Sequence, residues 1–400
     1  MLRTIAAAGI LVLILALLPF SAVAAEPAAN VSAEDYPAAP LLPDPFLKAD
    51  GSRVATVEEW RTQREALKKL ILDLQYGPLL PDIQDFEIVV DTELWEDPPS
   101  RVDHLQVTAK YDPSLKLEAV LYRPRDLDAG PYPLILAVEP LTGNNARPIV
   151  ELAIRRGYAI AGYQRHDLAP DEAGSAKGIY AAHPDYEGGA LAVWAWGALQ
   201  LRGLLASNKG IDSARVAITG HSRAGKVALL AGALDEGFTL VCPNGSGAGG
   251  AGCYRFSGAM AESLEAITQP ERFGYWFHPN LRVFAGKEAH LPFDQHFLKA
   301  LVAPRLLLST EALGDLWANP RGAQTTHMAA REVYRFLGAE DRIGIHFREG
   351  QHDQTLEDWE ALIDFADLHW RSKPTGRNFN TLPFKEETPR YDWHAPAAGR

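Results

Sequence analysis

The sequence contains few cysteines, and this scarcity limits the sites that it can build. Cys242 and Cys253 are the only two in 400 residues, which excludes a disulfide scaffold and a zinc site made of cysteines. A single bridge between the two and a pair of unpaired thiols remain as alternatives. Basic residues are also outnumbered, because 39 Lys and Arg face 51 Asp and Glu for a formal charge of −12. Without a basic stripe, nucleic acid is not an expected partner.

Long hydrophobic runs are also missing. An uncharged, Leu/Ile-rich run covers residues 9–18 and is shorter than the roughly 20 residues of a membrane-spanning helix. It follows the basic Arg3 and precedes small residues at 21–25, the pattern of a secretory signal peptide over residues 1–25. We therefore expect cleavage near Ala24 or Ala25, and a periplasmic or secreted protein with no membrane partner.

The rest of the chain alternates between strand and helix patterns. Residues 26–55 and 373–400 are rich in Pro and aperiodic, and are interpreted as an extended N-terminal segment and a C-terminal tail. Thr56 and Glu59 form a capping box, which predicts a helix that ends before Gly77. Strands are expected at 105–110, 117–122, 133–138, 158–163, 215–219, 238–242, 305–310 and 343–348, the first two as an antiparallel pair at one sheet edge. Helices are expected at 147–156, 185–207, 223–236, 323–338 and 355–372. This order predicts one α/β domain over 56–372, with a mostly parallel sheet between helices in a three-layer sandwich.

One serine lies where a predicted strand meets a predicted helix. The strand at 215–219 is followed by Ser222, and the small residues Gly220, Ala224 and Gly225 surround it. This succession is typical of a nucleophile elbow, the tight turn that exposes the serine oxygen in the α/β-hydrolase fold. A serine that only caps the helix is the alternative.

The order of residues in this fold narrows the choice of catalytic partners. The acid and then the histidine follow the serine, each after a strand. His352 lies between the final strand and the final helix and is the predicted base, whereas His346 lies inside a strand. The loop after 305–310 offers Asp315 as the acid, with Glu311 as the runner-up. A turn carboxylate that caps nearby amides is the alternative for Asp315.

Six segments resemble one family, the glucuronoyl esterases of carbohydrate esterase family 15, especially its bacterial branch. These segments are Gly-His-Ser-Arg-Ala-Gly-Lys (220–226), Gly-Ala-Gly-Gly (247–250), Leu-Pro-Phe-Asp-Gln-His (291–296), Ala-Pro-Arg (303–305), Asp-Leu-Trp-Ala-Asn-Pro-Arg-Gly (315–322) and Gly-Gln-His-Asp (350–353). The similarity runs from about residue 42 to about residue 370. The nucleophile motif with its Arg and Lys is far more specific than a bare serine elbow.

The resemblance implies a complete ester-hydrolysing site without metal or cofactor. The implied triad consists of Ser222, Asp315 and His352. The implied accessory residues are Arg223 in the oxyanion hole, Lys226 and Glu265 on glucuronate hydroxyls, and Trp317 beside the sugar ring. The implied substrate is the ester between 4-O-methylglucuronate on xylan and lignin alcohols. A fixed positive charge next to a developing alkoxide favours the transition state. The alternative for Arg223 or Lys226 is a surface side chain paired with a carboxylate. The alternative for Glu265 is a solvated helix face, and that for Trp317 is core packing.

Two positions depart from the fungal members of the family. Those members carry the triad acid as a Glu within a Gly-rich loop, where this chain has Gly245, and this favours Asp315. They also carry a Cys before the nucleophile, where this chain has His221, so their bridge to the histidine loop cannot form. Residues 143–145 resemble the family's other oxyanion-side loop, and a hydrogen-bond donor and a plain turn are both possible there.

Three other functions compete with this hypothesis. A serine esterase of different specificity, such as an acetylxylan esterase, would share the triad. A non-catalytic carbohydrate-binding protein would share only the scaffold. A zinc hydrolase could use Asp294, His296 and His290, although this spacing next to Pro292 is more typical of helix capping. A monomer is the expected state.

Overall fold

The computed structural model of the chain describes residues 31–400 apart from 84, 111, 127–128, 386–388 and 398–400. The predicted signal peptide therefore lies outside the described residues. Within the described ranges, no helix combines the length and hydropathy that crossing a bilayer requires.

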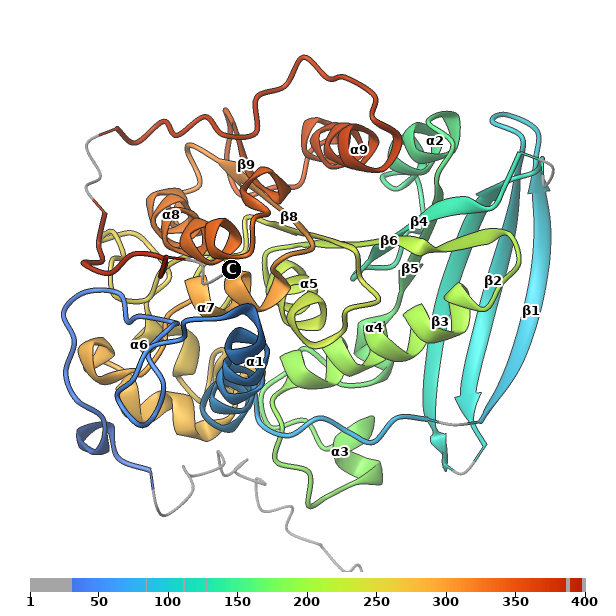
Figure 1. Cartoon of the computed structure of the whole chain (residues 1–400). Helices are drawn as coiled ribbons and strands as arrows, with labels where there is room; N and C mark the ends of the chain where they lie inside the picture. The colour runs from blue at the N-terminus through green and yellow to red at the C-terminus, as the bar shows by residue number, and fades with distance from the viewer. Residues whose placement is uncertain (1–30, 84, 111, 127–128, 386–388, 398–400) are drawn as a thin grey trace, which may run out of the picture.

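A nine-stranded sheet runs through the described part of the chain in the order β1-β2-β3-β5-β4-β6-β7-β8-β9 (Figure 1). Its strands are β1 (Phe86–Trp95), β2 (Ser100–Ala109), β3 (Asp112–Pro124), β4 (Tyr132–Ala137), β5 (Ala159–Tyr163), β6 (Ile211–His221), β7 (Leu240–Asn244), β8 (Leu306–Ala312) and β9 (Ile343–Arg348). In this sheet order, all neighbouring strands from β5 through β4 to β9 are parallel. The pairs β1 with β2, β2 with β3 and β3 with β5 are antiparallel. Loops after the parallel strands therefore meet at one edge of the sheet, where α/β proteins place their sites.

The antiparallel edge contains one strand more than the sequence predicted. β2 and β3 are antiparallel as expected, but β1 lies outside them and was missed. Eight of its residues are exposed, including the consecutive Ile88, Val89 and Val90. A strand with both faces in solvent does not need to alternate apolar and polar residues, so the period-2 signal was absent.

Helices cover both faces of the sheet, which confirms the predicted three-layer architecture (Figure 1). The helices on one face are α2 (Arg147–Arg155) and α9 (Leu356–Arg371). Those on the other are α1 (Val57–Ile71), α4 (Ala190–Ala206), α5 (Arg223–Leu234), α7 (His296–Val302) and α8 (Pro320–Phe336). Two short helices, α3 (Ile179–Ala182) and α6 (Leu264–Thr268), lie in connections.

The local signals for helix ends were largely correct. Thr56 accepts a hydrogen bond from the Glu59 amide at 3.2 Å, and Glu59 accepts one from the Thr56 amide at 3.3 Å, so the predicted capping box is confirmed. The chain then turns at Gly77, whose φ is 81°. The helix expected at 185–207 begins only at Ala190, because two consecutive glycines precede it and glycine disfavours helix.

The two extended segments pack on the domain and on each other. The Leu42 amide donates to the Arg390 carbonyl at 2.8 Å, and the Trp393 indole donates back to the Leu42 carbonyl at 2.8 Å. Phe46 is fully buried, with its ring centroid 6.3 Å from that of Trp393. The two segments are aperiodic in sequence, but buried aromatic side chains hold them on the domain.

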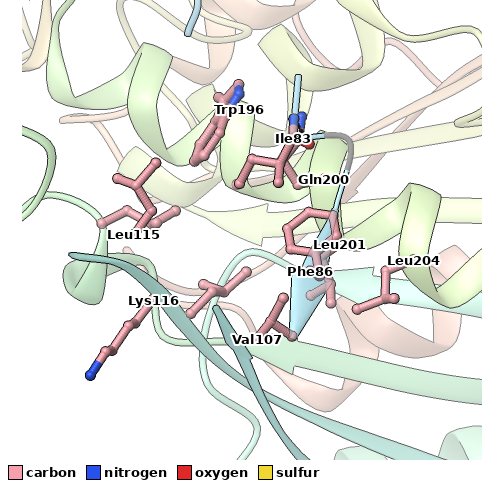
Figure 2. A pocket seen from close by; sticks show the side chains of 12 residues that line it. Ile83, Phe86, Val107, Leu115, Lys116, Trp196, Gln200, Leu201 and Leu204 are labelled. Carbon is pink, nitrogen blue, oxygen red and sulfur yellow. Dashed lines mark hydrogen bonds between the residues drawn. The ribbon is translucent and has the colours of Figure 1, made fainter. Parts of the chain in front are cut away.

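Two further features lie apart from the residues predicted for the site. Cys242 and Cys253 are free and buried, and burial raises the pKa of both thiols. An apolar pocket lies between α4 and the antiparallel strands, and its lining includes Trp196 and Leu201 of α4 and Val107 of β2 (Figure 2). None of the predicted site residues lines this pocket.

Candidate active site

Ser222 lies in a strained turn between β6 and α5. Its φ is 55°, a region that residues other than glycine rarely adopt. A Cβ at Gly220 would lie 2.5 Å from the Ala224 carbonyl oxygen, and a Cβ at Gly225 would lie 2.8 Å from the Asn244 carbonyl oxygen. Small residues are therefore required at both positions, as the elbow pattern predicted. Such strain is typical of functional sites.

The structure brings Ser222, His352 and Asp315 into one hydrogen-bonded chain. His352 Nε2 lies 2.9 Å from Ser222 Oγ, and His352 Nδ1 lies 2.6 Å from Asp315 Oδ2. The other Asp315 oxygen accepts the Ala318 amide at 3.1 Å. Asp315 therefore both caps a turn and contacts the histidine, so the two interpretations made from sequence describe different oxygens of one carboxylate.

Glu311 is placed differently. It lies within β8 rather than in the loop, and neither carboxylate oxygen has a hydrogen-bond partner. Burial raises its pKa well above the usual range, and the nearby Lys299 only partly opposes this. Glu311 therefore favours its neutral form and makes no hydrogen bond to His352.

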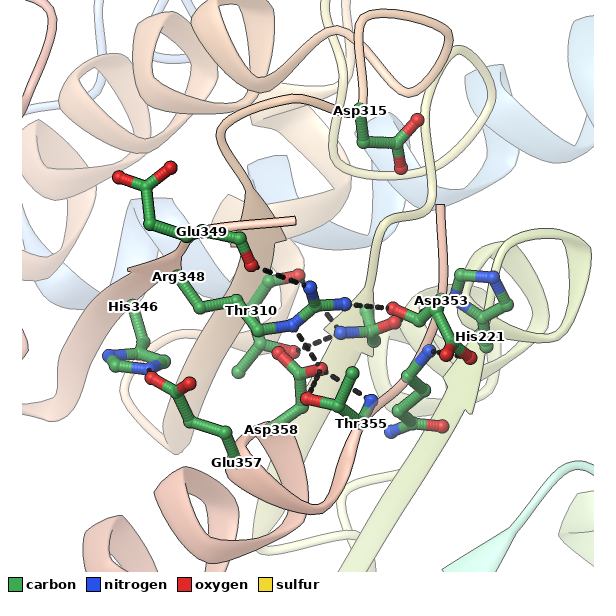
Figure 3. A network of polar contacts seen from close by, with 12 residues as sticks. His221, Thr310, Asp315, His346, Arg348, Glu349, Asp353, Thr355, Glu357 and Asp358 are labelled. Carbon is green, nitrogen blue, oxygen red and sulfur yellow. Dashed lines mark hydrogen bonds and ion pairs between the residues drawn. The ribbon is translucent and has the colours of Figure 1, made fainter. Parts of the chain in front are cut away.

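A buried arginine organises the loop that carries His352 (Figure 3). Arg348, the last residue of β9, donates to the carbonyls of Glu349 at 2.9 Å, Gln351 at 3.5 Å, and Asp353. Its Nε donates to Asp358 of α9 at 2.7 Å. These bonds lie on both sides of His352 and tie the loop to the strand before it and the helix after it.

Two residues that depart from the family pattern also contact the site. The His221 ring centroid lies 4.5 Å from that of His352, and His221 Nδ1 is 2.6 Å from Asn244 Oδ1. Burial lowers the pKa of His221. A Cβ at Gly245 would lie 3.3 Å from Asp315 Oδ2. A larger side chain at position 245 would therefore crowd the carboxylate that contacts His352.

Arg223 begins helix α5 beside the serine. Its guanidinium donates to Asp171 at 2.5 Å and lies over the Trp276 ring at 4.8 Å from the centroid. The side chain is 36% exposed. The amide of a first helical residue has no acceptor within its helix, so the Arg223 amide, which follows Ser222 directly in the chain, has no intrahelical partner.

Lys226 is more enclosed than the sequence suggested. It is 1% exposed, and its ammonium donates to the carbonyls of Ser246 at 2.7 Å and Ala248 at 2.6 Å and to Glu262 at 2.6 Å. Burial lowers the pKa of Lys226 and raises that of Glu262, and their mutual bond opposes both shifts. A sugar hydroxyl could reach this ammonium only by sharing or replacing one of these acceptors.

The glutamate that contacts Lys226 is not Glu265, the residue that the resemblance assigned to sugar hydroxyls together with Lys226. The carboxylate in contact is Glu262, whereas Glu265 is exposed in the first turn of α6. Ser263 caps α6, so Glu262 precedes the helix and can turn inward while Glu265 faces solvent. The distinction depends on where a five-residue helix begins, which the sequence did not reveal.

Trp317 and residues 143–145 lie in loops near the protein surface. Trp317 is half-buried, with the Arg272 guanidinium 5.2 Å from its ring centroid. Its carbonyl accepts the Glu262 amide at 2.9 Å, which places it next to the Lys226 pair. Residues 143–145 form an exposed turn before α2.

The residues considered for zinc are engaged elsewhere. Asp294 accepts the amides of Tyr254 at 2.9 Å and Gln295 at 2.8 Å, and His296 Nε2 is 2.9 Å from the Pro43 carbonyl. His290 Nδ1 lies 2.7 Å from the Tyr36 carbonyl. Across the described ranges, no group of three or more His, Cys, Asp or Glu is arranged to hold a metal ion.

Four residues of the site were missed by sequence reasoning. They are Asp171, Glu262, Trp276 and Arg348. The one available signal was the aromatic run around Trp276, since residues 273–277 include four aromatic side chains. The other three follow no motif, and only the folded chain places them.

Comparisons with known proteins show the family to which this chain belongs. The family model described as "Glucuronyl esterase, fungi" matches residues 106–338. A glucuronoyl esterase structure from Caldicellulosiruptor kristjansonii has a TM-score of 0.76 at 32% identity, covering 89% of this chain and 97% of that one. The 4-O-methyl-glucuronoyl methylesterase 1 of Wolfiporia cocos is 30% identical over 82% of this chain and 80% of its own length. Carbohydrate esterase MZ0003 of an unknown prokaryote is 29% identical over 82% and 89%. The chain thus has the α/β-hydrolase fold and is an esterase that belongs to the glucuronoyl esterases, carbohydrate esterase family 15.

Proposed function

We propose that this esterase hydrolyses 4-O-methylglucuronoyl esters, the cross-links between glucuronoxylan and lignin alcohols, with Ser222, His352 and Asp315 as its catalytic triad. The observation that carries the proposal is the continuous hydrogen-bonded chain from Ser222 Oγ through His352 to Asp315. The predicted signal peptide supports activity in the periplasm or outside the cell.

The reaction follows from this geometry as two acyl transfers. His352 Nε2 takes the Ser222 proton while Oγ attacks the C6 carbonyl of the uronate. Asp315 holds the imidazole tautomer and stabilises the imidazolium. The imidazolium then protonates the leaving alcohol as the acyl-enzyme forms, and a water molecule attacks that ester in the same way to release the uronate.

Two groups of Arg223 are assigned to the oxyanion. Its amide and its guanidinium both lie at the start of α5, where a developing negative charge is also stabilised by the helix N-terminus. For the sugar we assign Lys226, Trp317 and, in place of Glu265, Glu262. Glu262 is preferred because it contacts Lys226 at 2.6 Å and is joined through its amide to Trp317.

The central experiment compares three variants on benzyl glucuronate. Ser222→Ala and His352→Ala should each lower kcat by about 10⁴-fold or more. His346→Ala is the matched control, because His346 pairs with Glu357 at 3.3 Å and makes no contact with Ser222. It should retain wild-type kcat, and a Ser222→Ala enzyme with intact turnover would overturn the mechanism.

Substrate choice is tested separately. Wild-type kcat/KM on a glucuronate methyl ester should exceed that on an acetylated xylan by at least about tenfold, because Lys226, Glu262 and Trp317 recognise a uronate ring. A preference for the acetyl ester would favour an acetylxylan esterase and overturn the uronate assignment.

A further inference from the structure

Arg223 is held by a carboxylate from a distant part of the chain. Asp171 lies in the loop between β5 and α3, and its Oδ2 accepts the Arg223 guanidinium at 2.5 Å across a sequence separation of 52 residues. The Asp171 side chain is only 11% exposed. This pair therefore lies at the edge of the site rather than in open solvent, where ion pairs contribute little.

The orientation of Asp171 is itself fixed by other side chains. Its second oxygen, Oδ1, accepts the Tyr275 hydroxyl at 2.6 Å and the Trp276 indole at 2.9 Å. Two further groups lie slightly farther from Oδ2, the Arg165 guanidinium at 3.8 Å and the His166 imidazole at 3.7 Å, and burial lowers the pKa of His166. Donors on both oxygens leave this carboxylate little freedom to rotate.

These donors also keep Asp171 ionised. Burial opposes its ionisation, but the hydrogen bonds from Tyr275, Trp276 and Arg223 outweigh burial and lower its pKa. A lone carboxylate close to a developing oxyanion would oppose the reaction by charge repulsion. The donors around Asp171 offset that repulsion, so the carboxylate can hold Arg223 without a large electrostatic penalty.

Trp276 supplies the second constraint on Arg223. The guanidinium lies on its ring face, 4.8 Å from the centroid, and the Lys226 ammonium lies 5.9 Å from the same centroid. The indole is buried and stacks on Phe273 with centroids 4.2 Å apart. Trp276 thus supports the face of the Arg223 guanidinium and also donates to Asp171, the carboxylate that binds the edge of that guanidinium.

We infer that Asp171 is a positioning residue of the esterase reaction, which presets the Arg223 guanidinium on Trp276 so that its remaining N–H groups meet the oxyanion. This inference rests on the proposed role of Arg223. A guanidinium has five N–H donors, and Asp171 engages it through one nitrogen. Donors that are oriented before the reaction need no reorganisation when charge develops, so the effect of Asp171 should fall on kcat rather than on KM.

The test begins with Asp171→Asn and a matched control, Asp367→Asn. Asp367 is also a buried aspartate that binds a tyrosine and an arginine, Tyr158 at 2.6 Å and Arg156 at 2.7 Å, but it lies on α9. On benzyl glucuronate, Asp171→Asn should lower kcat about 10- to 100-fold with KM changed less than about threefold. Asp367→Asn should lower thermal stability and leave both constants near wild type. Asp171→Glu should recover part of the lost kcat.

A double-mutant cycle separates positioning from a merely structural role. If Asp171 acts through Arg223, then Asp171→Asn should have almost no effect in an Arg223→Met background. If Asp171→Asn does not fold, Tyr275→Phe removes one donor from the same carboxylate and should lower kcat about threefold or more, again only when Arg223 is present. Wild-type kcat in the folded Asp171 or Tyr275 variants, or additive losses in the cycle, would overturn the inference. Failure of Ser222→Ala to abolish turnover would instead overturn the proposed function.

Discussion

The two oxygens of Asp315 make different contacts, and this division explains how one residue serves the turn and the histidine. Oδ1 caps the turn through the Ala318 amide, which immobilises the carboxylate, and Oδ2 then meets His352 Nδ1 at 2.6 Å. Glu311, four residues earlier, is buried in β8 without a hydrogen-bond partner for its carboxylate. The chemistry of these two acids should therefore differ sharply.

We predict that Asp315→Asn lowers kcat about 10³- to 10⁴-fold, because an amide that donates to His352 Nδ1 favours the wrong imidazole tautomer. Glu311→Gln should stay within about threefold of wild type, since glutamine resembles the neutral acid that burial already favours. Steady-state turnover of a glucuronate ester by the two folded variants checks both expectations. Equal losses would remove the distinction between the two acids.

At the scale of elements, the loop from β9 to α9 is ordered by a side chain rather than by helix or strand pairing. Arg348 donates to three carbonyls of the loop and to Asp358, which also accepts the Thr355 amide at 2.8 Å (Figure 3). The adjoining loop is attached as well, because the Gly314 amide donates to the Gly350 carbonyl at 3.0 Å. The acid and the base of the proposed triad are thereby joined through their loops.

Replacing this arginine by lysine should loosen the loop while keeping the charge, because an ammonium lacks the fork that reaches several carbonyls at once. We expect Arg348→Lys to lower kcat about 10- to 100-fold and to accelerate amide hydrogen exchange over residues 349–355. The matched control is Arg371→Lys, whose guanidinium donates to the Arg156 and Gly157 carbonyls at 2.8 Å at the other end of α9. Normal kcat and exchange in Arg348→Lys would show that the loop is held by other contacts.

At the scale of the whole molecule, the two extended segments meet on a buried histidine. His296 of α7 lies 2.9 Å from the Pro43 carbonyl, and its ring stacks on Trp393 with centroids 5.8 Å apart. Burial lowers the pKa of His296 from 6.5 to about 4. Between about pH 6.5 and pH 4, His296 is therefore protonated in the unfolded chain and neutral in the folded chain.

The sign of the resulting pH dependence is clear. Because the folded pKa is depressed, stability contributed by neutral His296 is present above about pH 6.5 and is lost as the pH falls toward 4. Between pH 7 and pH 5 the loss should be about 2 kcal/mol in the free energy of unfolding. Urea denaturation of wild type and His296→Gln at both pH values tests this, and the variant should lose less. The same loss in both proteins would assign acid sensitivity to other groups, such as the buried His327.

The sequence alone determined the features that depend on neighbours along the chain. Gly220, Ser222 and Gly225 signalled the elbow because a turn that tight excludes a Cβ at its flanks, whatever the rest of the fold does. The capping box at Thr56 and the order of the buried strands could also be predicted, because both depend on residues that are close together in the chain. The choice of Asp315 and His352 followed from their places after predicted strands, and the structure puts them in contact.

Only the tertiary structure decided which charges meet. Asp171 reaches Arg223 from 52 residues away, and Glu262 rather than Glu265 reaches Lys226 from 36 residues away. Neither pairing has a local signal, because an ion pair between distant segments depends on how helices and loops pack. Arg348 is next to its loop in sequence, but its role appears only when burial turns the guanidinium onto the carbonyls around His352. Local sterics thus reveal the proposed nucleophile, whereas packing sets the electrostatic surroundings in which it lies.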